Sequence, residues 1–155
     1  FATTILLIVM FIGGCGGSTT CGIKVFRLQV LASTAKVQIS RLLRPHAVVL
    51  AYYNKRPVSV EVMDSVMGFF YLFILGFVLI AIMLGMAGLD FVTALSGAAT
   101  SISNVGPGLG EVIGADGNFS TLPDSAKWIM SFAMLLGRLE IFTVLVMLNP
   151  AFWQR

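Results

Sequence analysis

The fold is decided by residues 66–110, VMGFFYLFILGFVLIAIMLGMAGLDFVTALSGAATSISNVGPGLG. Residues 66–89 carry no charge and are long enough to cross the roughly 30 Å hydrocarbon core of a bilayer, which predicts a membrane-spanning helix. Residues 91–102 are apolar but cover only about half of a span. Residues 103–110 cannot continue a helix because of their glycines and proline. The pattern predicts a half-helix that enters the membrane and a loop that returns to the same side.

The composition also indicates a membrane protein. Of the 155 residues, 57% are hydrophobic and 11% are charged, whereas about 25% are charged in a typical soluble domain. The chain has too few polar side chains to cover a surface in water, which excludes an ordinary soluble domain and a disordered chain. Because the sequence begins with Phe1 inside an apolar run and without a basic region, we expect a fragment of a longer protein and no signal peptide.

Further helices are expected on both sides of the central stretch. Residues 1–12 are apolar but too short to span, and residues 23–43 return to helical character after a break. Residues 44–60 form a turn-rich polar linker. Residues 128–148 have the length of a span and should begin near Asp124. The sequence thus predicts an all-α membrane protein.

The basic residues predict the orientation of the chain. No acidic residue precedes Glu61, and most of the basic residues lie before it: Lys24, Arg27, Lys36, Arg41, Arg44, Lys55 and Arg56. The positive-inside rule assigns this segment to the cytoplasm. The helix at 66–89 then runs outward, and the acidic loop at 103–127 lies outside.

The break before residue 23 is rich in glycine: Gly13, Gly14, Cys15, Gly16, Gly17, Ser18, Thr19, Thr20, Cys21 and Gly22. This segment cannot hold a stable helix, since each glycine costs about 1 kcal/mol relative to alanine. A phosphate-binding loop is disfavoured because Ile23 stands where the lysine is required. Three interpretations stay open: an intramembrane gate, a transporter-type helix break that binds substrate, and a kink that permits close packing. The two cysteines make neither a disulfide framework nor a metal site.

The loop at 103–110 has the composition of an ion filter. Irregular backbone at membrane depth is tolerated where it is buried in protein or lines a water-filled path. After a half-helix, such a loop can present backbone carbonyls to a dehydrated cation. We expect Asn104, Val105 and Gly106 to carry these carbonyls, with Asn104 and Val105 as potassium ligands. The alternative is an ordinary external helix–turn.

Two cations are candidates for the same path. Arg138 is costly inside a bilayer and should face protein or water, and the glycine segment is its expected partner. Lys24 follows that segment directly. The alternative for Arg138 is a structural pair that only locks helices together, and the alternative for the basic run is a topology signal.

The motifs resemble those of the Trk, Ktr and HKT superfamily of potassium transporters, most closely the bacterial Trk-type members. FIGGCGGSTTCGIKVFR (11–27) resembles the broken inner helix of their third repeat, and SNVGPGLG (103–110) resembles their fourth pore loop. AKWIMSFAMLLGRLEIFTVLVMLNPAFWQR (126–155) resembles their C-terminal helix. The likeness covers nearly the whole chain and is weakest in the 44–60 linker.

The resemblance implies the C-terminal third of a four-repeat transporter. Residues 1–43 would be the broken inner helix of the third repeat, 44–60 a cytoplasmic linker and 61–155 the fourth helix–pore loop–helix repeat. Residues 104–106 would form one quarter of a potassium filter of moderate selectivity. Segment 13–22 would obstruct the path below it, with Arg138 and Lys24 as pore-side cations.

The resemblance also implies a setting for the protein. We expect a multi-pass protein of the bacterial inner membrane, with K⁺ as the permeant ion, no covalent cofactor and no enzymatic activity. Expected partners are the other three repeats of the same polypeptide, a second copy in a homodimer, a cytosolic nucleotide-binding regulatory subunit and membrane lipid, but no nucleic acid. An ion-coupled secondary transporter and a non-conducting scaffold subunit remain alternatives.

Overall fold

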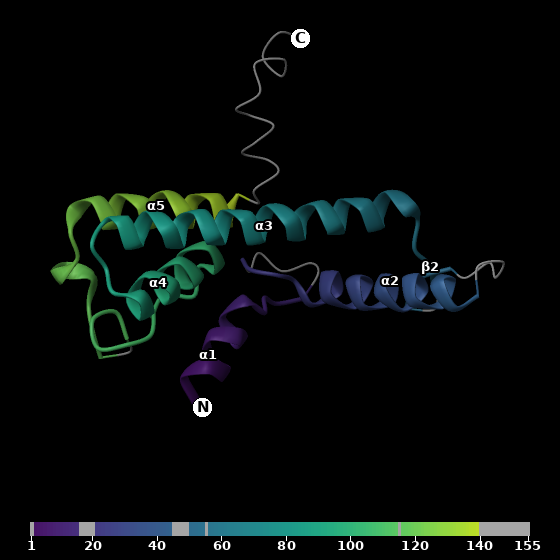
Figure 1. Cartoon of the computed structure of the whole chain (residues 1–155), viewed down its shortest axis with the longest axis horizontal. Coiled ribbons are helices and arrows are strands. Elements are labelled where there is room, and N and C mark those ends of the chain that lie inside the picture. Colours follow the sequence, from purple (N-terminus) through teal and green to yellow (C-terminus); the bar gives the residue numbers. More distant parts are fainter. Residues whose placement is uncertain (1, 16–20, 45–49, 55, 115, 140–155) are drawn as a thin grey trace, which may run out of the picture.

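The computed structural model describes residues 2–15, 21–44, 50–54, 56–114 and 116–139. Figure 1 shows a mostly helical chain in which the longest helix, α3, has α2 beside its first half and α5 beside its second half, while α4 packs against α3 and α5. The elements in chain order are α1 (Ala2–Phe11), α2 (Val25–Leu43), β1 (Tyr52–Tyr53), β2 (Arg56–Pro57), α3 (Val60–Met86), α4 (Phe91–Ser103), the single-turn helix η1 (Phe119–Thr121) and α5 (Asp124–Arg138).

The predicted helical character is confirmed, with one addition in the linker. Strands β1 and β2 form an antiparallel pair with Tyr52 opposite Pro57, and Asn54 in the turn between them has a positive φ of 48°. Asparagine tolerates that left-handed conformation better than most residues. The Ser33 hydroxyl of α2 donates to the Tyr52 carbonyl at 3.1 Å, which holds the hairpin against the preceding helix.

Helix α3 is, within the part of the chain that the structure describes, the one helix long and apolar enough to cross a membrane. It begins at Val60 and ends at Met86, so the predicted bounds of 66–89 were wrong at both ends. Glu61 lies inside its first turn, where a carboxylate stabilises the helix dipole. Glu61 and Asp64 lie outside the uncharged stretch, but they continue the same helix.

One face of α3 packs on the protein, and the rest is exposed. Leu84 has no exposed surface and Phe73 keeps 3%, whereas Tyr71 keeps 68%. The buried side chains are Val66, Phe69, Phe73, Ile80 and Leu84. Apolar side chains exposed around the remaining surface suit contact with lipid or with further helices.

Helix α4 is the predicted half-helix and is nearly enclosed. Its side chains are buried from Thr93 onward except for Leu95, and its small alanines, serines and Gly97 let α3 and α5 approach on two sides. The Asp90 carboxylate caps its start by accepting the Thr93 N–H at 3.2 Å. Hydrogen bonds from the Thr93 side chain and backbone hold the pKa of Asp90 below its ordinary value.

Helix α5 begins at the predicted position. Pro123 precedes Asp124 with φ −57° and ψ 146°. Proline suits the entry to a helix because it has no backbone N–H that would be left without an acceptor there. Ala126, Met130 and Ala133 form its buried face. The structure describes this helix to Arg138, so residues 140–148 of the predicted span lie outside the described residues.

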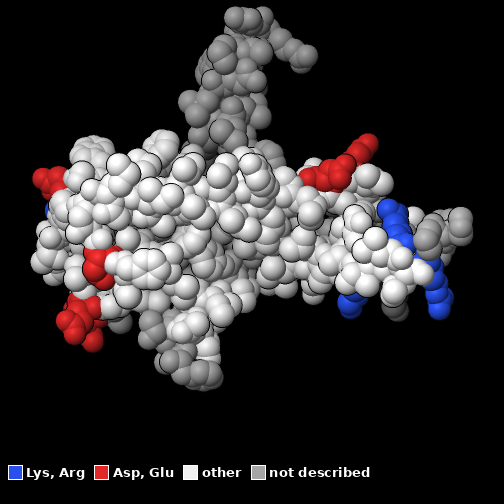
Figure 2. Space-filling view, in the orientation of Figure 1, with Lys and Arg blue, Asp and Glu red and all other residues white. Residues whose placement is uncertain are grey.

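Charged side chains occupy the two ends of the long axis (Figure 2). Basic groups gather near the end of α2 and the β1–β2 hairpin, and acidic groups gather near the opposite end, with a further acidic group by the start of α3. The surface between them carries no visible charge in this view. This separation suits an apolar band that lies between two aqueous faces.

Candidate functional site: two irregular segments around one cavity

The loop that follows α4 is bonded back onto that helix through its backbone N–H groups. Asn104 N–H donates to the Ser101 carbonyl at 3.3 Å, and Val105 N–H donates to the Thr100 carbonyl at 3.1 Å. Gly106 N–H donates to the Thr100 hydroxyl at 3.0 Å. Within the described ranges, the carbonyl oxygens of residues 104–106 accept no backbone hydrogen bond. The donors are therefore satisfied, and the acceptors are left for another ligand.

The backbone of this loop turns through left-handed conformations. Asn104 has φ 53° and ψ 44°, and Gly106 has φ 109°. A side chain at Gly106 would meet nothing within 4 Å, so glycine is required there by backbone conformation and not by space. Alternating conformations of this kind change the direction in which successive carbonyls point.

Side chains from two helices fix the rest of the loop. The Ser96 hydroxyl of α4 donates to the Leu109 carbonyl at 3.2 Å, in a buried position. The Asn104 Nδ2 donates to the Met134 carbonyl of α5 at 3.0 Å. Farther on, Gly108 N–H donates to the Ile113 carbonyl at 2.7 Å. The loop is thus attached both to its own helix and to the next one.

The glycine segment is closed at its base by backbone pairing. Ile12 and Ile23 form a parallel bridge, in which Gly13 N–H donates to the Ile23 carbonyl at 2.8 Å and Ile23 N–H donates to the Phe11 carbonyl at 2.9 Å. Gly22 has φ 79°, a conformation that favours glycine. Because the bridge is parallel, the chain runs in the same direction before and after the segment, as a broken helix does. Residues 16–20 lie outside the described residues.

One cavity of about 700 Å³ joins the two segments. Its lining includes Gly13 and Cys21 from the glycine segment, Asn104 and Val105 from the loop after α4, and apolar side chains of α1 such as Val9. The structure therefore brings Asn104 and Val105, two of the three predicted filter residues, together with both described ends of the predicted gate segment. Cys15 and Cys21 are both free thiols.

The predicted cations lie at different places. Arg138, at the end of α5, reaches the glycine segment as expected, with its Nη1 3.9 Å from Cys21 Sγ. Lys24 occupies the residue before α2 with φ −60° and ψ 139°, and it is half-buried. Arg138 thus places a cationic group beside the cavity, whereas Lys24 is the N-cap residue of α2.

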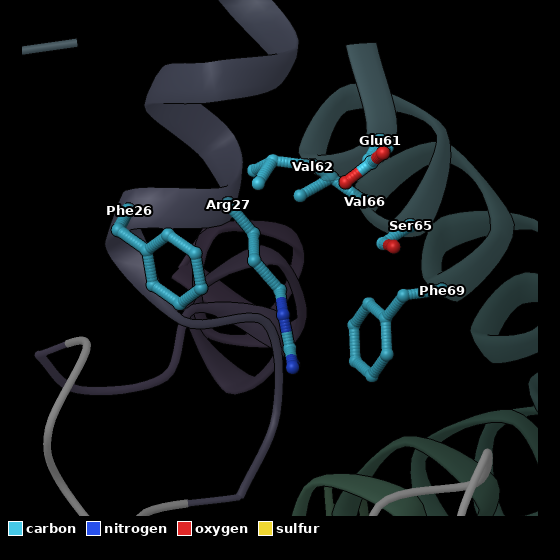
Figure 3. A pocket seen from close by; sticks show the side chains of 7 residues that line it. All are labelled: Phe26, Arg27, Glu61, Val62, Ser65, Val66 and Phe69. Carbon is cyan, nitrogen blue, oxygen red and sulfur yellow. The ribbon is translucent and has the colours of Figure 1, made fainter. Parts of the chain in front are cut away.

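A second cavity of about 470 Å³ lies between α2 and α3 (Figure 3). Arg27 extends between the rings of Phe26 and Phe69, and its guanidinium carbon lies 3.9 Å from the Phe69 ring centre. A cation–π contact of this kind contributes about 0.5–1 kcal/mol at an exposed site. It ties the basic start of α2 to α3, a role that the sequence analysis did not assign to Arg27.

Sequence analysis missed three residues that shape the loop. Thr100 and Ser96 are buried hydroxyls that bond to it, and Gly137 lies against the end of α4. Polar side chains in an apolar half-helix were a usable signal for the first two, since buried hydroxyls need partners. Gly137 carried no such signal, because its importance depends on which helix it meets.

The sequence of the whole chain matches a known protein family. The family model named TrkH and described as a cation transport protein matches residues 1–155. The chain belongs to the TrkH family. Among curated TrkH-family relatives, the potassium uptake protein TrkI of Halomonas elongata is 49% identical over 94% of the chain. TrkH of Vibrio parahaemolyticus is 41% identical over 99%, and TrkH of Escherichia coli is 38% identical over 99%.

The fold also matches a solved TrkH. The crystal structure of the potassium transporter TrkH from Vibrio parahaemolyticus aligns with a TM-score of 0.87 and 41% identity over 97% of the chain. The chain covers 32% of that structure and spans about 30% of the length of TrkI of Halomonas elongata. The TrkH family and the membrane-transporter fold are therefore established, and the expected similarity to Trk-type transporters is confirmed.

Proposed function

We propose that this chain supplies one filter loop and the gate segment of a potassium-uptake pore in the bacterial inner membrane. The main support is the loop after α4, whose three successive N–H groups are bonded to α4 while the carbonyls of Asn104, Val105 and Gly106 accept no backbone hydrogen bond from the described residues. Backbone carbonyls of this kind can replace the hydration shell of a potassium ion. No covalent chemistry is required of the chain.

The remaining parts of the proposal follow the family pattern. Residues 1–43 act as a broken inner helix, 44–60 as a cytoplasmic linker and 61–155 as a helix–pore loop–helix repeat. Three further repeats would complete the filter, because one loop cannot surround a dehydrated ion. A homodimer, surrounding lipid and a cytosolic nucleotide-binding regulatory subunit belong to the same proposal. Lys24 and Arg138 act as pore-side cations.

The glycine segment is proposed as the gate because its described ends line the same cavity as Asn104 and Val105. Gly13 and Cys21 line the same space as Asn104, and Arg138 contacts Cys21. Replacing residues 13–22 by an alanine stretch that continues the helix is expected to change rubidium flux into vesicles. Unchanged flux would contradict the gate assignment.

A filter substitution tests the function itself. Gly106→Ala adds a methyl group in open space, so its effect arises from the left-handed backbone alone. A strain of about 1–2 kcal/mol predicts a roughly tenfold loss of discrimination between potassium and sodium. The measurement is rubidium uptake into vesicles that contain the full-length protein, in competition with potassium or with sodium. A variant with the wild-type ratio would refute the filter.

A further inference from the structure

The last described turn of α5 lies in unusually close contact with the end of α4. A Cβ placed on Gly137 would lie 2.0 Å from the Ile102 carbonyl oxygen and 2.9 Å from Asn104 Nδ2. No side chain fits at such distances unless the two helices separate. The absence of a side chain at residue 137 therefore sets how closely α5 approaches the beginning of the filter loop.

Asn104 makes the complementary contact from the other side. It follows the last residue of α4 in the left-handed conformation that glycine and asparagine commonly adopt at helix ends. Glycine would meet that backbone requirement equally well. Only asparagine also supplies an amide, and this amide spans the gap to the Met134 carbonyl at 3.0 Å. The side chain thus has a task beyond ending the helix.

We propose that Asn104 and Gly137 form a clamp that positions the filter loop and thereby sets ion selectivity. The proposal rests on the proposed function, and it assigns both residues a positioning role through side-chain groups that bind no ion. Asn104 carries both a proposed filter carbonyl and the side-chain amide that is bonded to α5, and Val105 is the next residue. Movement of this anchor would change the spacing of the carbonyls that surround the ion.

The clamp makes a prediction that a purely structural role does not. Opening it should allow the loop to relax while α4 and its other bonds, from Thr100 and Ser96, remain in place. Removing the Asn104 amide would then leave the yield of folded protein near that of the wild type, but the ratio of potassium to sodium competition would fall. A helix-packing role alone would lower yield and flux together and leave the ratio unchanged.

The experiment compares two single variants with a matched control, each measured as the full-length protein reconstituted into vesicles. Asn104→Gly keeps the left-handed backbone but removes the amide, and we expect a roughly 2- to 10-fold loss of discrimination from the missing hydrogen bond. Gly137→Ala should have at least as large an effect. Gly85→Ala makes the same change within α3, where a Cβ meets nothing within 4 Å, and should keep the wild-type ratio.

The double variant tests whether the two residues act together. Because each substitution opens the same contact, Asn104→Gly combined with Gly137→Ala should lose little more discrimination than the stronger single variant. Wild-type discrimination in Asn104→Gly would overturn the clamp, even if Gly137→Ala failed to fold. In that case, a loss of discrimination in Gly106→Ala would still leave the proposed function intact. A wild-type protein without rubidium uptake would overturn the proposed function, and the clamp with it.

Discussion

The two irregular segments are held in place by different groups. The loop at 103–110 is attached by side chains from two helices, namely the Thr100 and Ser96 hydroxyls and the Asn104 amide. The described ends of the glycine segment are joined by backbone pairing between Gly13 and Ile23, with Arg138 as a contact from another helix. Side-chain attachment fixes the loop at several points, whereas backbone pairing closes the glycine segment at its base.

The largest effect is expected where the backbone pairing is broken. An added Cβ at Gly13 would lie 2.5 Å from the Cys21 carbonyl oxygen, so Gly13→Ala forces the two bridged segments apart. We expect a loss of about 3 kcal/mol in the free energy of unfolding, the upper part of the usual range for overpacking. Thermal unfolding in detergent measures it, with Gly85→Ala as the control. Equal stability of the two variants would show that the pairing is not tight.

An intermediate effect is expected where a side-chain attachment is removed. Thr100→Val deletes the hydroxyl that accepts the Gly106 N–H, and an unsatisfied donor of this kind costs about 1–2 kcal/mol. The loss should appear both in thermal unfolding and in ion discrimination, because the bond lies in the proposed filter loop.

Thr34→Val provides the control for this change. The Thr34 hydroxyl is buried in α2 and has no hydrogen-bond partner in the described part of the chain. Its replacement by valine should therefore leave stability unchanged or raise it slightly. If Thr34→Val destabilised the protein as much as Thr100→Val, the cost would belong to the loss of any threonine and not to the loop attachment.

The smallest effect concerns the far end of the helix that carries the loop. Since hydrogen bonds from Thr93 hold the pKa of Asp90 below 3.8, its ionised form stabilises the folded state above that pH. The contribution is lost as the pH falls through the lower pKa of the folded protein. Asn also caps helices well, so Asp90→Asn should keep the fold near neutral pH but remove this acid-dependent change. Unfolding temperatures that fall equally in both proteins on acidification would contradict it.

Much of the fold follows from the sequence, but the attachment of the loop does not. Uncharged runs and clusters of glycine and proline locate the helices and both breaks, and the cost of burying Arg138 leads to its contact with the glycine segment. Helix α3 begins before the predicted span because Glu61 and Asp64 interrupt the apolar window while continuing the helix. The bond from Asn104 to Met134 depends on how α4 crosses α5, which no local pattern specifies.

The last described turn of α5 couples ion selectivity to gating in the proposed pore. Met134 and Gly137 contact the loop after α4, and Arg138, in the same turn, contacts the glycine segment. A tilt or rotation of this single turn would displace both linings of the proposed permeation path at once. Conductance and ion selectivity should then vary together among substitutions at 134–138. A variant at these positions that is identified by a raised ion flux should therefore also show altered ion selectivity.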